Sequence, residues 1–168
     1  QAGLNALQPS QKDLEHGLEL HRNAIVCESY GFAPRAALDG DALRDAMEAG
    51  ASEIELQDLR EEMGMTRMVT DASERREFIE GWDAAGVTCV FQNAGEEGQS
   101  VTRLIKRLAR YTFVTDVIPD VVRRAATPDD IIRAKRDGAR CLYFSGNGVP
   151  LAEDWTSPEE ELRYIRLF

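Results

Sequence analysis

The sequence is poor in the residues from which most metal and thiol-based catalytic sites are built. It contains only two histidines and three cysteines among 168 residues. His16 and His21 lie five residues apart in a stretch that we expect to be helical, so they do not share a helical face for one metal ion. The cysteines, Cys27, Cys89 and Cys141, are odd in number and widely spaced, which argues against a disulfide framework and a zinc knuckle. We therefore expect solvent-exposed histidines and three buried thiols used as small apolar side chains.

Positive charge and long apolar runs are also scarce. The chain has 20 basic and 30 acidic residues, a formal net charge of -10. This balance argues against binding to nucleic acid or to an anionic membrane surface, since both need a basic face. No apolar run approaches the roughly 20 residues of a membrane-spanning helix, and no basic segment followed by an apolar one marks a secretory signal. We expect no membrane association and, by default, a cytoplasmic location.

Three short apolar runs, at residues 24–27, 87–91 and 141–144, are separated by amphipathic helical stretches. A strand, a long helical crossover and another strand make the pattern of a parallel sheet with helices on its faces. The sequence therefore predicts an α/β fold with about three parallel strands and flanking helices, the N-terminal half of a TIM-like (β/α) barrel.

A complete barrel of this kind takes about 250 residues. The apolar stripe of the last predicted helix continues to Phe168. We therefore expect residues 1–168 to be one incomplete barrel domain, completed by a second chain or by a missing C-terminal half. The alternative is a small open sheet whose last helix packs on a partner.

Helix caps and charged stretches complete the outline of the predicted helices. Four start signals place a capping side chain before a helical stretch, at Ser10, Asp71, Thr127 and Ser157. A helix over residues 52–63 is expected to end at residues 64–66, where Gly64 interrupts the pattern. Two charged sets are interpreted as solvated helix faces. They are residues 60–62 and the basic residues Arg103, Lys106, Arg107 and Arg110.

The segments that follow the apolar runs are polar and rich in glycine. They are residues 28–31, 92–95 and 145–148. In parallel α/β folds, ligands bind just past the carboxyl ends of the strands, so these segments are expected to form a substrate site. Taken singly, each residue is more simply a turn former, and only their coincidence at three strand ends favours a site. The candidate substrate-binding residues are Ser29, Tyr30, Asn93 and Asn147.

Four stretches of the chain together resemble a known family. They are residues 20–26, which lead into the first strand, residues 127–138, a helix, residues 140–148, a strand with its turn, and residues 159–168. This combination resembles the N-terminal half of the membrane (renal) dipeptidase family, zinc metallopeptidases with an amidohydrolase-like barrel. The resemblance implies hydrolysis of a dipeptide or a similar small amide, a pair of zinc ions, and a homodimer as the family pattern.

The chain departs from the family where the metal ligands belong. The first strand of the family ends in a His-x-Asp pair, and the matching positions here are Ser29 and Gly31. The place of the bridging acid is taken by Asn147 or Gly146. Such residues do not replace imidazole and carboxylates at a two-zinc centre. Zinc is therefore implied by the resemblance but not supported by the residues of this chain, and no metal ligand is assigned.

Three hypotheses follow. The first is a metal-dependent hydrolase that resembles membrane dipeptidases, with the metal ligands of this half replaced and with its strand-end residues orienting a small-molecule substrate. The second is a catalytically inactive dipeptidase homologue that acts as a binding or scaffold protein. In the third, the polar strand-end residues only form turns and caps. No catalytic residue is assigned in any of them.

Overall fold

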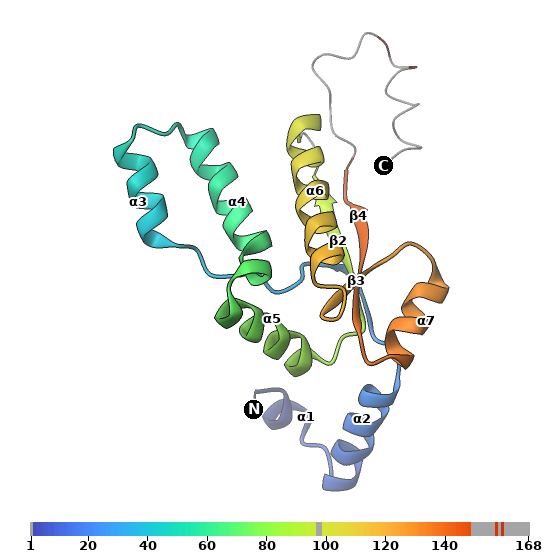
Figure 1. The fold of residues 1–168 in the computed structure, drawn as a ribbon. Helices are drawn as coiled ribbons and strands as arrows, with labels where there is room; N and C mark the ends of the chain where they lie inside the picture. Colours follow the sequence, from blue (N-terminus) through green and yellow to red (C-terminus); the bar gives the residue numbers. More distant parts are fainter. Residues whose placement is uncertain (1, 97–98, 149–156, 158, 160–168) are drawn as a thin grey trace.

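The computed structural model describes residues 2–96, 99–148, 157 and 159 and shows an α/β fold (Figure 1). Within these residues the sheet has four strands in the order β1-β2-β4-β3, and every neighbouring pair is parallel. The predicted fold class, a parallel sheet with flanking helices, is therefore confirmed. The strands are β1 (Cys27–Gly31), β2 (Cys89–Gly95), β3 (Val122–Ala125) and β4 (Arg140–Gly146).

Seven helices are found in the described part of the chain. They are α1 (Ala2–Leu7), α2 (Gln11–Asn23), α3 (Gly40–Glu48), α4 (Glu53–Thr70), α5 (Ala72–Ala85), α6 (Val101–Val117) and α7 (Pro128–Arg136). The predicted caps Ser10, Asp71 and Thr127 are confirmed, because each side chain accepts a hydrogen bond from a backbone N–H of the first helical turn. None of these helices has the length and apolar character needed to cross a bilayer.

Helices cover both faces of the sheet. Val90 and Leu142 belong to the main core, which is filled from α4, α5 and α6. Their chain neighbours Cys89 and Cys141 belong to a second cluster with Ala134 of α7. Since successive residues of a strand point to opposite faces, α7 lies on the face opposite α6. Right-handed crossovers explain this, because the chain passes from β2 outward to β3 and then back to β4.

The order of the strands agrees only in part with the sequential winding of a barrel. Strands β1, β2 and β4 follow one another in chain order, as expected for three consecutive barrel strands. Strand β3 is an additional edge strand beyond β4 and was not predicted, because its four residues include two arginines and lack an apolar run. A barrel has all its helices on the outside, so the position of α7 also differs from that pattern.

The bounds of the predicted strands need correction. The run at residues 24–27 was expected to be buried, yet β1 begins at Cys27 and its first four residues are exposed at the edge of the sheet. Strands β2 and β4 continue beyond their apolar runs, into residues 92–95 and 145–146. The polar segments expected to follow the strands are thus partly the last residues of the strands themselves.

The predicted end of the helix over residues 52–63 is wrong. Helix α4 continues through Gly64 to Thr70 and is ended by Asp71. A glycine inside a helix costs about 1 kcal/mol relative to alanine, whereas continuing the helix buries Met65 and Met68 in the main core. Burial of these two side chains outweighs the low helix propensity of one glycine.

The cysteines are only partly as expected. Cys89 and Cys141 are buried, but Cys27 is exposed at the sheet edge. Both histidines are exposed, as predicted. The helix expected to start at Ser157, with its apolar stripe, lies outside the described residues.

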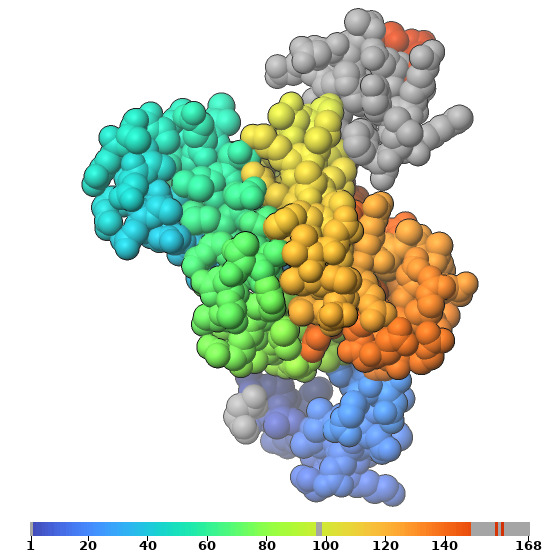
Figure 2. All heavy atoms as spheres, in the orientation of Figure 1, coloured from blue at the N-terminus to red at the C-terminus, as the bar shows by residue number. Residues whose placement is uncertain are grey.

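The N-terminal helices contribute nothing to the core. No residue of α1 or α2 is buried, and Leu7 and Leu20 are among the exposed apolar side chains. Figure 2 shows this segment in blue, projecting from one end of the body of the molecule. The four strands with α4, α5, α6 and α7 are therefore the part of the fold that positions a site.

Candidate functional site

Three of the four predicted site residues form one hydrogen-bonded group at the carboxyl end of the sheet. The Asn147 side-chain amide donates to the Tyr30 hydroxyl, with 3.0 Å between the heavy atoms. Asn93 Nδ2 donates to Asn147 Oδ1 at 3.3 Å, and the Asn147 backbone N–H donates to Asn93 Oδ1 at 3.3 Å. We call Tyr30, Asn93 and Asn147 the strand-end cluster; it joins residues that are 54 and 117 positions apart in the chain.

Ser29, the fourth candidate, is not part of this group. It is exposed on β1, and no side-chain hydrogen bond between it and the cluster is found in the described part of the chain. The pairing of β1 with β2 shifts between Glu28 and Gly31, so strand alternation alone does not predict which side chain reaches the cluster. Tyr30, with its longer side chain, reaches Asn147.

Two glycines allow the strand ends to approach closely. Asn93 is paired with Ser145 and Gly95 with Gly146, with a register shift between these pairs. A Cβ atom on Gly146 would lie 3.1 Å from the Cα of Gly95. The Asn147 backbone N–H also donates to Gly95 O at 3.0 Å, which fixes the turn that follows β4.

An aromatic pair lies on the same face of the sheet as Asn93. Phe91 and Asn93 are two residues apart in β2, so their side chains point to the same side. Phe91 packs against Tyr143 of β4, with 4.8 Å between the ring centroids, and Tyr143 is partly exposed. Asn93 itself is only 2% exposed. This face therefore combines an accessible aromatic surface with the amide groups of the strand-end cluster.

On the opposite face of the sheet, the cavity that described residues form beside Gln92 and Tyr111 is too small for a ligand. There Gln92 accepts a hydrogen bond from the Ala33 N–H at 2.7 Å and donates to the Tyr111 hydroxyl at 2.8 Å. Burial raises the pKa of Tyr111 to about 12, so this hydroxyl remains a neutral partner. The cavity beside these groups measures about 10 Å³, room for at most one water. Gln92 is therefore a packing residue.

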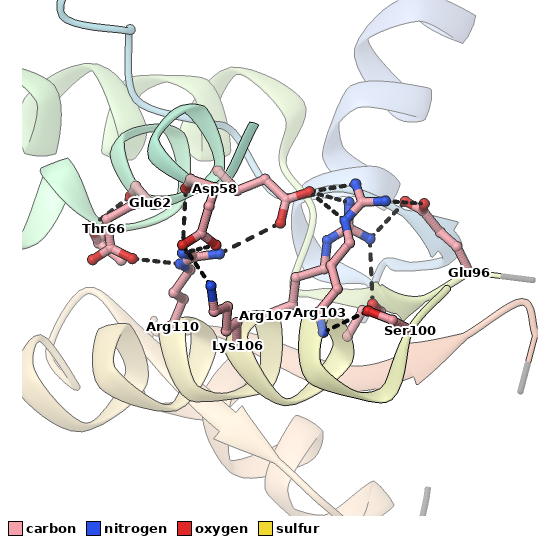
Figure 3. A network of polar contacts seen from close by, with 11 residues as sticks. Asp58, Glu62, Thr66, Glu96, Ser100, Arg103, Lys106, Arg107 and Arg110 are labelled. Atoms are coloured by element: carbon pink, nitrogen blue, oxygen red, sulfur yellow. Dashed lines mark hydrogen bonds and ion pairs between the residues drawn. The ribbon is translucent and has the colours of Figure 1, made fainter. Parts of the chain in front are cut away.

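An ion-pair network joins α4 to α6 and to the end of β2 (Figure 3). Its members are Asp58, Glu61, Glu62, Glu96, Arg103, Lys106, Arg107 and Arg110. Glu61 lies at its centre and is 3.0 Å from Arg103 Nε and 3.1 Å from Arg107 NH2. The four acidic and four basic residues balance in charge, so the helix interface is electrically neutral.

This network corrects in part the expectation that these charges form solvated helix faces: Glu62 and Lys106 are exposed as expected, but three other members are buried. The side chains of Glu61, Arg107 and Arg110 are only 7–8% exposed. Burial alone would raise the pKa of Glu61, but hydrogen bonds and charges from Arg103 and Arg107 bring that pKa below its ordinary value. The network's acidic residues on α4 and its basic residues on α6 each recur every three or four positions, which places each set on one helical face. This matching pattern could have indicated the interface from the sequence.

The residues present do not fit a two-zinc site. Ser29 is an exposed hydroxyl, Gly31 and Gly146 have no side chain, and the amide of Asn147 is bonded to Tyr30 and Asn93. Among the residues that the structure describes, no group of three or more His, Cys, Asp or Glu side chains is arranged to bind a metal ion. Hydrogen bonding to Cys89 and burial raise the pKa of the Cys141 thiol, which disfavours its thiolate form.

The chain was compared with models of protein families, with curated proteins and with solved structures, and none of them matches it.

Proposed function

We propose that the strand-end cluster binds a small molecule that contains an amide, such as a dipeptide, within a hydrolase that resembles the membrane dipeptidases. The observation that supports this most is the hydrogen-bonded contact of Tyr30, Asn93 and Asn147 at the carboxyl edge of a parallel sheet. This edge is where ligands bind in parallel α/β folds.

The chemistry of the cluster suits an amide. Tyr30 accepts a hydrogen bond from Asn147 through its oxygen, so its own O–H proton is available to a ligand carbonyl. Asn147 is exposed and keeps one side-chain N–H and one Oδ1 lone pair for further bonds. The cluster therefore offers neutral donors and acceptors to the C=O and N–H of an amide. The aromatic pair of Phe91 and Tyr143 offers an apolar surface for a side chain of the ligand.

The role proposed for these residues is binding and orientation. By the resemblance, Ser29, Gly31 and Asn147 or Gly146 match the family's metal-ligand positions, and these residues do not fit zinc. We therefore derive no hydrolytic step from this chain. On the resemblance, we also propose a TIM-like barrel that a second half or a second chain completes, and a homodimer. On the composition, we propose a cytoplasmic location.

A second function is favoured by that same replacement of ligands. A dipeptidase homologue without its metal centre would bind a small molecule or a partner protein and would not hydrolyse it. The closed hydrogen bonding between Asn93 and Asn147 supports this alternative, because it gives the edge a defined shape without any metal.

Calorimetric titration with the dipeptide Gly-Leu tests the proposal. We expect Tyr30→Phe and Asn147→Ala to weaken binding by about fivefold each, since each removes a hydrogen bond to the ligand that contributes about 1 kcal/mol. Asn23→Ala, an exposed asparagine at the end of α2, is the matched control and should bind as the wild type does. Absence of binding by the wild-type protein would refute the proposed site.

Turnover then separates the two functions. Release of free amino acids from Gly-Leu, abolished by a chelator and restored by zinc, would identify the hydrolase. Binding of Gly-Leu without release, together with no retained zinc after dialysis, would identify the inactive homologue.

A further inference from the structure

We infer that Arg107 is a positioning residue for the strand-end cluster, although it contacts none of the three cluster residues. The inference concerns the geometry of the cluster in the ligand-free protein. Its consequence for ligand affinity rests on the proposed function.

Arg107 bonds to both residues that flank Gly95 at the end of β2. Its NH1 group donates to Ala94 O at 3.4 Å and to Glu96 Oε1 at 2.6 Å. Its NH2 group donates to Glu61 Oε1 at 3.1 Å, and Glu61 belongs to α4. One guanidinium therefore ties the end of β2 to the interface between α4 and α6 (Figure 3).

The residue between these two contacts determines where Asn147 lies. Gly95 O accepts the backbone N–H of Asn147 at 3.0 Å. Gly95 is also in close backbone contact with Gly146, the residue before Asn147. A shift of Gly95 would thus move Asn147 and lengthen its bonds to Asn93 and Tyr30, which are already 3.0–3.3 Å long.

Arginine suits this role better than lysine does. The planar guanidinium has five donors in a fixed arrangement, so it can bond to a carbonyl and to two carboxylates in different directions. A lysine ammonium at the same place retains the charge but is a compact group on a flexible stem. The 7% exposure of the Arg107 side chain shows that the charge is held between its partners, away from solvent.

Arg110 provides a matched control one helical turn away. Its side chain is 8% exposed, and it is bonded to Asp58 and Glu62 of α4. No contact between Arg110 and the end of β2 is found in the described residues. Removing either guanidinium weakens the same helix interface, but only the loss of Arg107 releases Gly95.

Amide hydrogen exchange of the ligand-free protein tests the inference. For Arg107→Met we expect exchange of the Asn147 amide to accelerate at least fivefold relative to the Leu142 amide in the middle of β4. For Arg110→Met this ratio should stay within twofold of the wild type. Arg107→Lys should not restore the wild-type ratio, because the ammonium does not reproduce the divergent bonds.

The inference would be overturned if the ratio of Asn147 to Leu142 exchange were the same in the wild type and in both Arg107 variants. It would also be overturned if Arg110→Met accelerated Asn147 exchange as much as Arg107→Met does. If Arg107→Met does not fold, Glu96→Gln takes its place, because it weakens the bond at the strand end and leaves the contact of Arg107 with Glu61. It should accelerate Asn147 exchange at least twofold, and an unchanged ratio would again overturn the inference.

The same variants relate the geometry to the ligand. If the wild type binds Gly-Leu, Arg107→Met should bind it at least fivefold more weakly than Arg110→Met does. If the wild type does not bind Gly-Leu, the proposed function fails, and the exchange ratios still decide whether Arg107 positions Asn147.

Discussion

Replacement of Glu61 is the most demanding test of the interface between α4 and α6. Glu61 is buried and lies within bonding distance of Arg103, Arg107 and Arg110. Removing one partner of a buried ion pair costs about 3–5 kcal/mol, because the remaining charge is left uncompensated. Arg107 retains Glu96, so for Glu61→Leu we expect a loss at the lower limit, about 3 kcal/mol.

Glu61→Gln separates charge from shape. Glutamine has nearly the same volume and retains one acceptor oxygen, so the expected loss is about 1–2 kcal/mol. The control is Glu53→Gln, since Glu53 is paired with Arg60 but its side chain is 80% exposed. An exposed pair contributes about 0–1 kcal/mol, and we expect the control to lose less than about 0.5 kcal/mol.

Urea unfolding followed by far-ultraviolet circular dichroism measures these differences. A loss of about 3 kcal/mol is a large share of the 5–15 kcal/mol that stabilises a typical domain. The unfolding midpoint should therefore move clearly for Glu61→Leu and hardly at all for Glu53→Gln. If the two substitutions cost the same, Glu61 is not the centre of a buried network and the argument for the helix interface is refuted.

Three further predictions follow from the same structure. Gly146→Ala should destabilise the protein by about 1–3 kcal/mol in urea unfolding, because its Cβ would meet the rigid backbone of Gly95; an unchanged midpoint would contradict this. Gly64→Ala should stabilise by about 0.5–1 kcal/mol, because its Cβ would lie 3.9 Å from its nearest neighbours inside α4; a clear loss would contradict it. The pKa values of Glu61 and Asp58 are lowered in the folded protein. The stability that these two carboxylates contribute to the folded protein is therefore complete above their unfolded pKa of about 4. It is lost as the pH falls through their pKa values in the folded protein. The urea midpoint of the wild type should therefore decrease when the pH is lowered below 4, and it should decrease less in Glu61→Gln. A constant midpoint, or an equal decrease in both proteins, would refute this.

The strand ends could be placed only approximately, because the apolar runs are local features of the sequence and β2 and β4 continue beyond them into residues 92–95 and 145–146. The predictions that Asn93 and Asn147 would lie together needed only that β2 and β4 be parallel neighbours. The exclusion of Ser29 could not be predicted, since it depends on a register shift in β1. Strand β3 was missed because an edge strand of four residues needs no apolar pattern.

The charged interface was missed for a different reason. A run such as residues 60–62 gives no local sign of burial, because the partner charges lie more than 40 positions away on α6. Burial of a charge depends on tertiary contacts that neutralise it. Only the complementary spacing on two separate helices contained this information.

Chemical-shift mapping with Gly-Leu decides whether the strand-end cluster is the binding site, because it reports which residues of the protein contact the ligand. The largest changes should fall on the side-chain amides of Asn93 and Asn147 and on the backbone of Tyr30. Saturable changes centred on any other part of the molecule, or no saturable change at all, would contradict the claim that this strand edge is the binding site.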